Sequence, residues 1–122
     1  MLIQEVLSTN TVLYHGSTNQ IDGFTGVVYF TPREDAAKAY ARGKRKSKGD
    51  VAYLYAVQVS YRNPYYFKSM QQIGSLTQPT VEQLKQEGYD AAVYDGSGKE
   101  PIPEVVPFYP ELVKIINQEI VK

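Results

Sequence analysis

The sequence predicts an α+β fold of about six short strands and two or three helices. The chain has 122 residues, which suits a single domain, and it is 43% hydrophobic and 21% charged, as globular chains are. Short apolar runs are interrupted by two segments of helical periodicity. Strands and helices neither alternate strictly nor leave a pure β pattern, so a doubly wound sheet is disfavoured. We expect residues 1–122 to form one domain.

Strands are predicted where runs rich in β-branched and aromatic residues are bounded by Gly, Pro, Asn or Asp. Residues 51–60 (VAYLYAVQVS) form the strongest run, and the pair Asn63-Pro64 ends it. Pro107 makes the run that contains it suitable for a sheet edge. The remaining strands are predicted at 11–15, 27–31, 91–95, 104–109 and 112–116.

Two helices are predicted from their capping residues. Residues 32–44 combine Pro32 at the first position, Thr31 as N-cap, and acidic residues before basic ones. Their residues Ala36, Ala39 and Tyr40 share one face. A second helix covers residues 80–88, with Thr80 as its N-cap. The polar stretch 69–79 has no clear pattern and predicts no regular element.

Composition excludes several classes of function. The chain has no Cys, which excludes disulfides, thiolate-bound zinc and a cysteine nucleophile, and no metal site is predicted. Thirteen basic and thirteen acidic residues give no general attraction to nucleic acid or membranes. No apolar run approaches the roughly 20 residues of a membrane span. Residues 2–8 predict one or two amphipathic helical turns and lack the features of a signal peptide, so a cytoplasmic location is expected.

Three segments carry the residues that could perform chemistry. His15-Gly16-Ser17 ends a predicted strand and holds the chain's only histidine. Tyr29 lies in an apolar strand, and Tyr40 follows eleven residues later on the predicted helix. Glu104 begins another apolar strand. Each residue alone is compatible with a purely structural role, so the argument depends on their combination.

In that combination the chain resembles the catalytic core of NAD-dependent ADP-ribosyltransferases of the His-Tyr-Glu kind, the diphtheria-toxin-like and poly(ADP-ribose)-polymerase-like branch. That branch has a His-Gly at a strand end, a Gly-aromatic strand with a Tyr, a second Tyr eleven residues later and a late Glu. The resemblance spans about residues 11–116 and is weakest from 61 to 103. It implies a compact split β-sandwich that binds NAD as co-substrate.

The resemblance also implies roles for these residues. Glu104 and His15 are the candidate catalytic residues, and the candidate NAD-binding residues are His15, Gly16, Ser17, Tyr29 and Tyr40. Two Tyr faces can sandwich the nicotinamide ring, and the Gly16 backbone can bond its carboxamide. His15 is expected to donate to a ribose hydroxyl. Glu104 is expected to accept from the ribose 2′-hydroxyl and offset positive charge in the transition state.

Departures from the family narrow the expectation. Ala37 stands where the polymerase branch usually has Ser, which favours the toxin branch. The arginine-modifying branch has Arg on the first strand and an acidic residue or Gln two residues before the Glu, so His15 and Ile102 disfavour arginine modification. The short chain favours transfer of a single ADP-ribose. Glu100 is a rival to Glu104, but a strand fixes the direction of Glu104 better than a loop fixes that of Glu100.

A basic segment at the end of the predicted helix, residues 42–50 (RGKRKSKGD), could serve binding. Its residues Arg42, Lys44 and Arg45 are candidate contacts to the NAD diphosphate or to an acceptor, although such runs are often plain solvated surface. The predicted function is mono-ADP-ribosylation of a macromolecular acceptor, protein or nucleic acid, as in a bacterial or phage effector or toxin. The alternatives are an NAD glycohydrolase, an RNA 2′-phosphotransferase-like enzyme, and a non-catalytic member that binds NAD or a protein.

Overall fold

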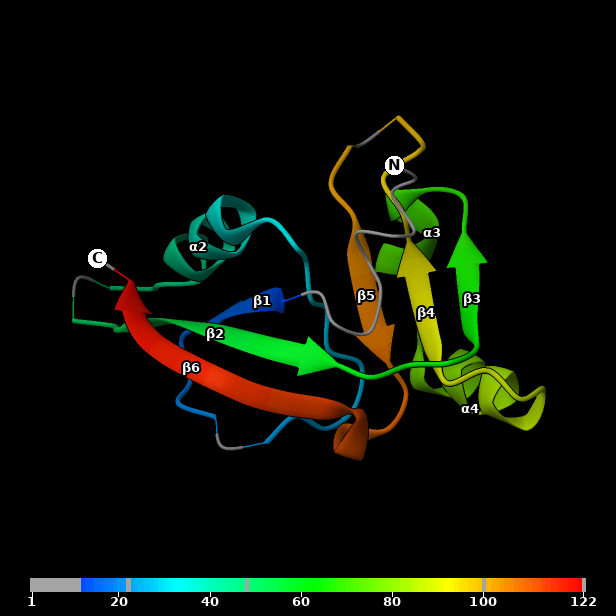
Figure 1. The fold of residues 1–122 in the computed structure, drawn as a ribbon. Helices are drawn as coiled ribbons and strands as arrows, with labels where there is room; N and C mark the ends of the chain where they lie inside the picture. Colours follow the sequence, from blue (N-terminus) through cyan, green and yellow to red (C-terminus); the bar gives the residue numbers. More distant parts are fainter. Residues whose placement is uncertain (1–11, 22, 48, 100, 122) are drawn as a thin grey trace.

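The computed structural model describes residues 12–21, 23–47, 49–99 and 101–121. It confirms the α+β prediction, with six strands in two small sheets and three α-helices among these residues (Figure 1). The helical turns predicted at 2–8 lie outside the described residues. In chain order the elements are β1 (Val12–Ser17), α2 (Glu34–Gly43), β2 (Ala52–Val59), β3 (Pro64–Phe67), α3 (Met70–Gly74), α4 (Gln78–Gln86), β4 (Ala91–Tyr94), β5 (Glu104–Pro107), a 3-10 turn (Pro110–Leu112) and β6 (Val113–Val121).

The two sheets have different topologies. One sheet has the order β1-β2-β6, and both of its strand pairs are antiparallel. The other has the order β3-β4-β5, in which β3 and β4 are parallel and β4 and β5 antiparallel. Helices α3 and α4 lie between β3 and β4 in sequence and make that parallel crossover possible. In Figure 1 strands β2 and β6 run from side to side, whereas β3, β4 and β5 stand upright.

A two-residue segment ties the sheets together. Thr31 exchanges backbone hydrogen bonds with Tyr14 of β1, at 2.7 and 3.0 Å. Its neighbour Phe30 does the same with Val105 of β5, at 2.8 and 2.9 Å. The strand predicted at 27–31 is therefore reduced to two isolated bridges. Because these bridges couple β1 to β5, His15 and Glu104 are held in one framework although 89 positions separate them in the numbering.

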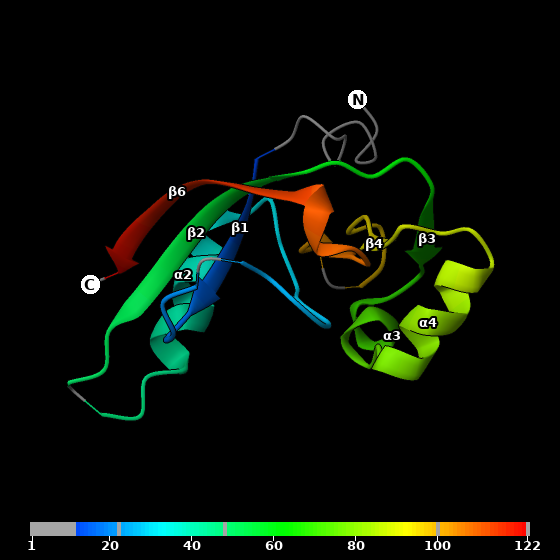
Figure 2. The ribbon, with the colours of Figure 1, turned by 90° about the horizontal axis from the view of Figure 1, so that it is seen from below.

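The core consists of three apolar clusters. The largest lies between the two sheets and includes Val57 of β2 and Val93 of β4, both fully buried. A second cluster packs Ile73 of α3 and Leu84 of α4 against the β3-β4-β5 sheet. The third packs α2 onto β1 and β2, on the outer face of the other sheet. Seen from below, α2 lies with β1 and β2 at one end, and α3 and α4 lie at the other (Figure 2).

Several predicted boundaries were wrong for local reasons. Helix α2 begins at Glu34 with Arg33 as N-cap, because Thr31 instead uses its hydroxyl to accept the Arg33 N–H in the preceding turn. Its buried residues are Ala37 and Ala41, whereas Ala39 and Tyr40, of the face predicted from the sequence, are exposed. The predicted face was displaced because the helix is anchored by small residues and not by its largest side chain.

Around α3 and α4 the sequence signals were weak or misread. Ser69 caps α3 by accepting the Gln72 N–H, but a five-residue helix is too short to show a period. Thr77 caps α4 by accepting the Thr80 N–H, which moves the start one turn ahead of the prediction. The pair Asn63-Pro64 follows the end of β2, as predicted, but Pro64 also begins β3, a strand that was not predicted. A proline is tolerated there because β3 is an edge strand. None of the described helices has the length and hydrophobicity that a membrane crossing requires.

Candidate active site

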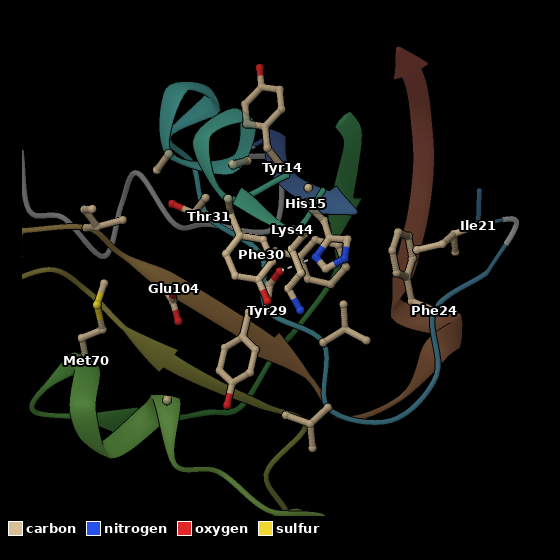
Figure 3. Close-up of a pocket in the computed structure, with 18 of the residues that line it drawn as sticks. Tyr14, His15, Ile21, Phe24, Tyr29, Phe30, Thr31, Lys44, Met70 and Glu104 are labelled. Carbon is tan, nitrogen blue, oxygen red and sulfur yellow. Dashed lines mark hydrogen bonds between the residues drawn. The ribbon is translucent and has the colours of Figure 1, made fainter. Parts of the chain in front are cut away.

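A cavity of about 810 Å³ opens between α2, β1, β5, α3 and the loop that follows β1. This volume lies within the range of small-molecule sites. Of the predicted site residues, the cavity lining includes His15, Gly16, Tyr29, Tyr40, Lys44 and Glu104. Figure 3 shows Glu104 and Met70 on one side of the cavity and Phe24 and Ile21 on the opposite side, with Tyr29 and His15 between them. The sequence therefore identified residues that the fold brings together.

The His15 imidazole is fixed by one hydrogen bond and two aromatic contacts. Its Nδ1 lies 2.8 Å from the Tyr29 carbonyl oxygen. The ring also packs on Phe24 and Phe30, with centroids 5.4 and 5.5 Å away. Burial lowers the pKa of His15, the bond to Tyr29 opposes this, and the nearby Lys44 charge adds to the lowering. His15 is therefore neutral at neutral pH.

This neutrality changes the role expected for His15. A carbonyl oxygen only accepts, so Nδ1 carries the proton and Nε2 is left as an acceptor. From the sequence we expected His15 to donate to a ribose hydroxyl, and with this tautomer the neutral ring has no N–H left for that bond. Through Nε2 the ring can instead accept a hydrogen bond from such a hydroxyl.

Gly16 is required by packing as well as by position. A Cβ at this residue would lie 2.2 Å from the Ala37 carbonyl oxygen and 2.9 Å from the Ala41 Cβ, so any side chain would push α2 off β1. Tyr14 directs its backbone N–H and C=O away from β2, toward Thr31. Alternate residues of a strand share this direction, so those of Gly16 point to the same edge. The Gly16 backbone N–H and C=O therefore lie at a sheet edge beside the cavity.

The two tyrosines differ in how firmly they are held. Tyr29 is half-buried, and its hydroxyl donates to the Ile73 carbonyl oxygen at 2.9 Å. Burial raises its pKa, and the nearby Glu104 charge contributes. Tyr40 is 55% exposed on α2, so part of its ring is free to stack. One ring is a fixed wall of the cavity, and the other is an open surface at its mouth.

Glu104 begins β5, opposite Tyr94 of β4. Along β5 the side chains alternate, so Glu104 lies on the face that Val106 buries against α3 and α4. Its carboxylate is half-buried, and burial raises its pKa. Among the described residues no hydrogen bond or ion pair involves this carboxylate. A carboxylate partly withdrawn from water in this way is available to a ligand.

Three predicted contacts fall outside the cavity lining. Ser17 ends β1, and its hydroxyl accepts the Asn19 N–H at 3.0 Å, which stabilises the turn after the strand. Arg42 and Arg45 belong to the basic segment, but of its described residues only Lys44 lines the cavity. The rival carboxylate Glu100 lies outside the described residues.

Other lining residues were missed because they come from loops without a pattern. Phe24 is buried against His15 and Phe30, and Ile21 enters the wall because its N–H donates to the hydroxyl of Tyr55. Tyr55 is fully buried, and its hydroxyl also donates to the Asn19 carbonyl oxygen at 3.2 Å. A Tyr in the middle of the strongest strand was the available signal, since a buried hydroxyl needs a partner.

Comparison with known proteins does not assign the chain to a family. No protein-family model matches the sequence, and no curated protein matches it significantly. Among the described residues no cluster of His, Asp and Glu could hold a metal ion. Function is therefore inferred from the cavity itself.

Proposed function

We propose that this protein is an NAD-dependent mono-ADP-ribosyltransferase that acts in the cytoplasm and moves ADP-ribose from NAD to a macromolecular acceptor. The observation that carries the proposal is the half-buried Glu104 carboxylate, without a partner among the described residues, in a cavity that also contains His15, Tyr29 and Tyr40. These four residues are the ones on which the resemblance was based, and in three dimensions they line one cavity.

The cavity offers a complementary group for each part of the reacting end of NAD. The planar nicotinamide ring can stack between Tyr29 and Tyr40. The edge N–H and C=O of Gly16 can bond the carboxamide, which has both a donor and an acceptor. Nε2 of neutral His15 can accept from a ribose hydroxyl. Glu104 can accept from the 2′-hydroxyl on the other side of the ribose.

Glu104 supplies the largest part of the catalytic effect in this mechanism. When the bond between ribose C1′ and the ring nitrogen breaks, the electron pair goes to that nitrogen and nicotinamide leaves neutral. Positive charge then develops on the ribose, where the Glu104 carboxylate stabilises it. The same carboxylate can take the proton of an acceptor hydroxyl, amine or water that attacks C1′. Because the site is partly closed to water, the charge acts more strongly than it would in bulk solvent.

The lining disfavours one alternative. Removal of a 2′-phosphate from RNA needs several cations around the phosphate. Among the described lining residues Lys44 is the only cation, and Glu104 is an anion. An NAD glycohydrolase and a non-catalytic NAD-binding protein would use the same cavity, so they are distinguished by experiment.

The test measures nicotinamide release from NAD by the purified protein, with and without cell lysate as a source of acceptors. Glu104→Gln is expected to lower release by about 10²- to 10³-fold, since it removes the charge that stabilises the transition state. The matched control is Glu111→Gln, because Glu111 is exposed in the 3-10 turn and outside the cavity lining.

Release that depends on Glu104 and increases with lysate would support a transferase. Release that depends on Glu104 but ignores lysate would favour an NAD glycohydrolase. Equal release by the wild type and Glu104→Gln would contradict the assignment of Glu104. Saturable NAD binding with no release would leave the non-catalytic alternative.

A further inference from the structure

Lys44 lines one side of the cavity at the end of α2, where its backbone is fixed and its side chain is exposed. It is the C-cap of α2, and its backbone N–H donates to the carbonyl oxygens of Tyr40 and Ala41 at 3.1 and 3.2 Å. Residues four apart on a helix share a face, so Lys44 lies above Tyr40. Its Nζ is 4.9 Å from the centroid of the Tyr40 ring. The ammonium thus lies over one face of the Tyr40 ring, close to where a planar ligand would stack.

The Lys44 and Glu104 charges lie on different sides of the cavity. Figure 3 shows Lys44 near His15, and Glu104 on the other side of Tyr29. The charge of Lys44 contributes to the lowered pKa of His15, and that of Glu104 contributes to the raised pKa of Tyr29; burial is the larger cause in both. No salt bridge joins Lys44 to Glu104 within the part of the chain that the structure describes. The cavity therefore has a positive and a negative side.

We propose that Lys44 makes this cavity discriminate by charge, binding a neutral nicotinamide ring in preference to a cationic one, and that this preference promotes cleavage of NAD. The inference rests on the proposed function, because it takes the ring of NAD as the ligand that stacks on Tyr40. It gives Lys44 a role toward the ring, which differs from a contact to the diphosphate.

The reaction moves positive charge in the direction that this arrangement favours. In NAD the ring nitrogen carries the positive charge, and Lys44 repels it. As the C1′–N bond breaks, its electron pair neutralises the ring, and the positive charge moves to the ribose beside Glu104. Lys44 therefore destabilises the bound substrate more than the transition state, and Glu104 stabilises the transition state. Both effects lower the barrier between them.

The test compares the affinities of two small rings, nicotinamide, which is neutral, and 1-methylnicotinamide, which carries the pyridinium charge. Calorimetry or ligand-detected NMR gives the ratio of their Kd values without any turnover. Wild type is expected to prefer nicotinamide, and Lys44→Met is expected to reduce that preference about tenfold, or about 1.4 kcal/mol. Lys44→Arg should keep the preference, because it keeps the charge. Lys46→Met is the matched control, since Lys46 is exposed in the same basic segment but outside the cavity lining.

A second measurement separates the ring role from a diphosphate contact. ADP-ribose has the diphosphate but no nicotinamide, so Lys44→Met should leave its Kd unchanged while kcat for nicotinamide release falls about tenfold. A weaker Kd for ADP-ribose with an unchanged ring preference would overturn the inference in favour of a phosphate contact. An unchanged ring preference in every variant would also overturn it.

The inference and the proposed function can fail separately. A Lys44-dependent preference for the neutral ring, with no cleavage of NAD, would support the inference and contradict the proposed enzyme. Cleavage that depends on Glu104, with a ring preference that ignores Lys44, would do the reverse. No saturable binding of either ring would overturn both the role of Lys44 and the assignment of this cavity to nicotinamide.

Discussion

Two carboxylates beside the β3-β4-β5 sheet are held in very different ways. Asp90, just before β4, accepts the backbone N–H groups of Arg62 and Asn63 at 2.7 and 3.0 Å. Its own N–H donates to the Asn63 carbonyl oxygen at 3.1 Å, which closes the corner between β2 and β3. Glu104, at the start of β5, is half-buried with no such partner among the described residues. The Asp90 carboxylate stabilises the fold, whereas the Glu104 carboxylate makes no such stabilising contact among the described residues.

This difference marks Glu104 as the carboxylate of the two that is available to a ligand. A buried polar group is ordinarily satisfied by the protein, because an unsatisfied one costs free energy. At Asp90 the chain follows that rule, but at Glu104 it leaves a charge exposed to the cavity and to whatever binds there. Unsatisfied groups of this kind are characteristic of active sites, where stability is given up for chemistry. The comparison predicts opposite responses when each carboxylate is altered.

The largest effect on stability is expected at Asp90. Asp90→Ala removes two charge-assisted hydrogen bonds and leaves two backbone N–H groups at the corner without their acceptor. We expect the free energy of unfolding to fall by about 2 kcal/mol, measured by urea denaturation. Asp95→Ala is the control, because among the described residues the Asp95 carboxylate accepts a single backbone N–H, that of Ser97, at 3.0 Å. Equal losses in the two variants would show that the corner is not specially stabilised.

The fold could be predicted from sequence where the pattern was long. Residues 51–60 contain β2, since an eight-residue strand shows its hydrophobicity clearly. The two bridges at Phe30 and Thr31 could not be foreseen, because they depend on tertiary pairing between β1 and β5. Strand β6 continues to Val121, although its exposed polar residues after 116 gave no apolar signal. That extension is decided by backbone pairing with β2 and not by burial.

The identity of the candidate site residues could be predicted from the order and spacing of a few short segments. His15, Tyr29, Tyr40 and Glu104 were selected from the sequence, and all four line one cavity. Their states were not predictable: the tautomer of His15 depends on the Tyr29 carbonyl oxygen, a backbone group 14 positions away. The anchoring of the Tyr29 hydroxyl to Ile73 likewise needed α3, which the sequence did not reveal. Hydrogen-bond partners distant in sequence decide these features.

A smaller effect of opposite sign is expected at Glu104. Glu104→Gln keeps the size of the side chain and removes a charge that burial destabilises. The free energy of unfolding at neutral pH should be unchanged or higher by up to about 1 kcal/mol, while nicotinamide release is lost. Urea denaturation of the wild type, Glu104→Gln and Glu111→Gln measures this. A clear loss of stability in Glu104→Gln alone would mean that the carboxylate is a structural group, as Asp90 is.

The smallest and most specific effect is the pH dependence of that difference. Burial raises the folded-state pKa of Glu104 above its ordinary value of 4.5, so between the two values the native state binds more protons than the unfolded state. Stability from this group is then present below pH 4.5 and is lost as pH rises through the raised pKa. Glu104→Gln lacks this loss, so its stability advantage over wild type should be near zero in acid and should grow with pH to a plateau.

His15 has a lowered pKa, from 6.5, and gives the reverse slope, with stability lost as pH falls through the lowered value. Because both proteins contain His15, its contribution cancels in the difference. In the proposed mechanism nicotinamide release needs ionised Glu104, so the acidic limb of its pH profile should lie above pH 4.5, in the same window. A stability difference that does not vary with pH would show that Glu104 titrates as an ordinary solvated carboxylate. Glu104 would then not be a charge that burial destabilises.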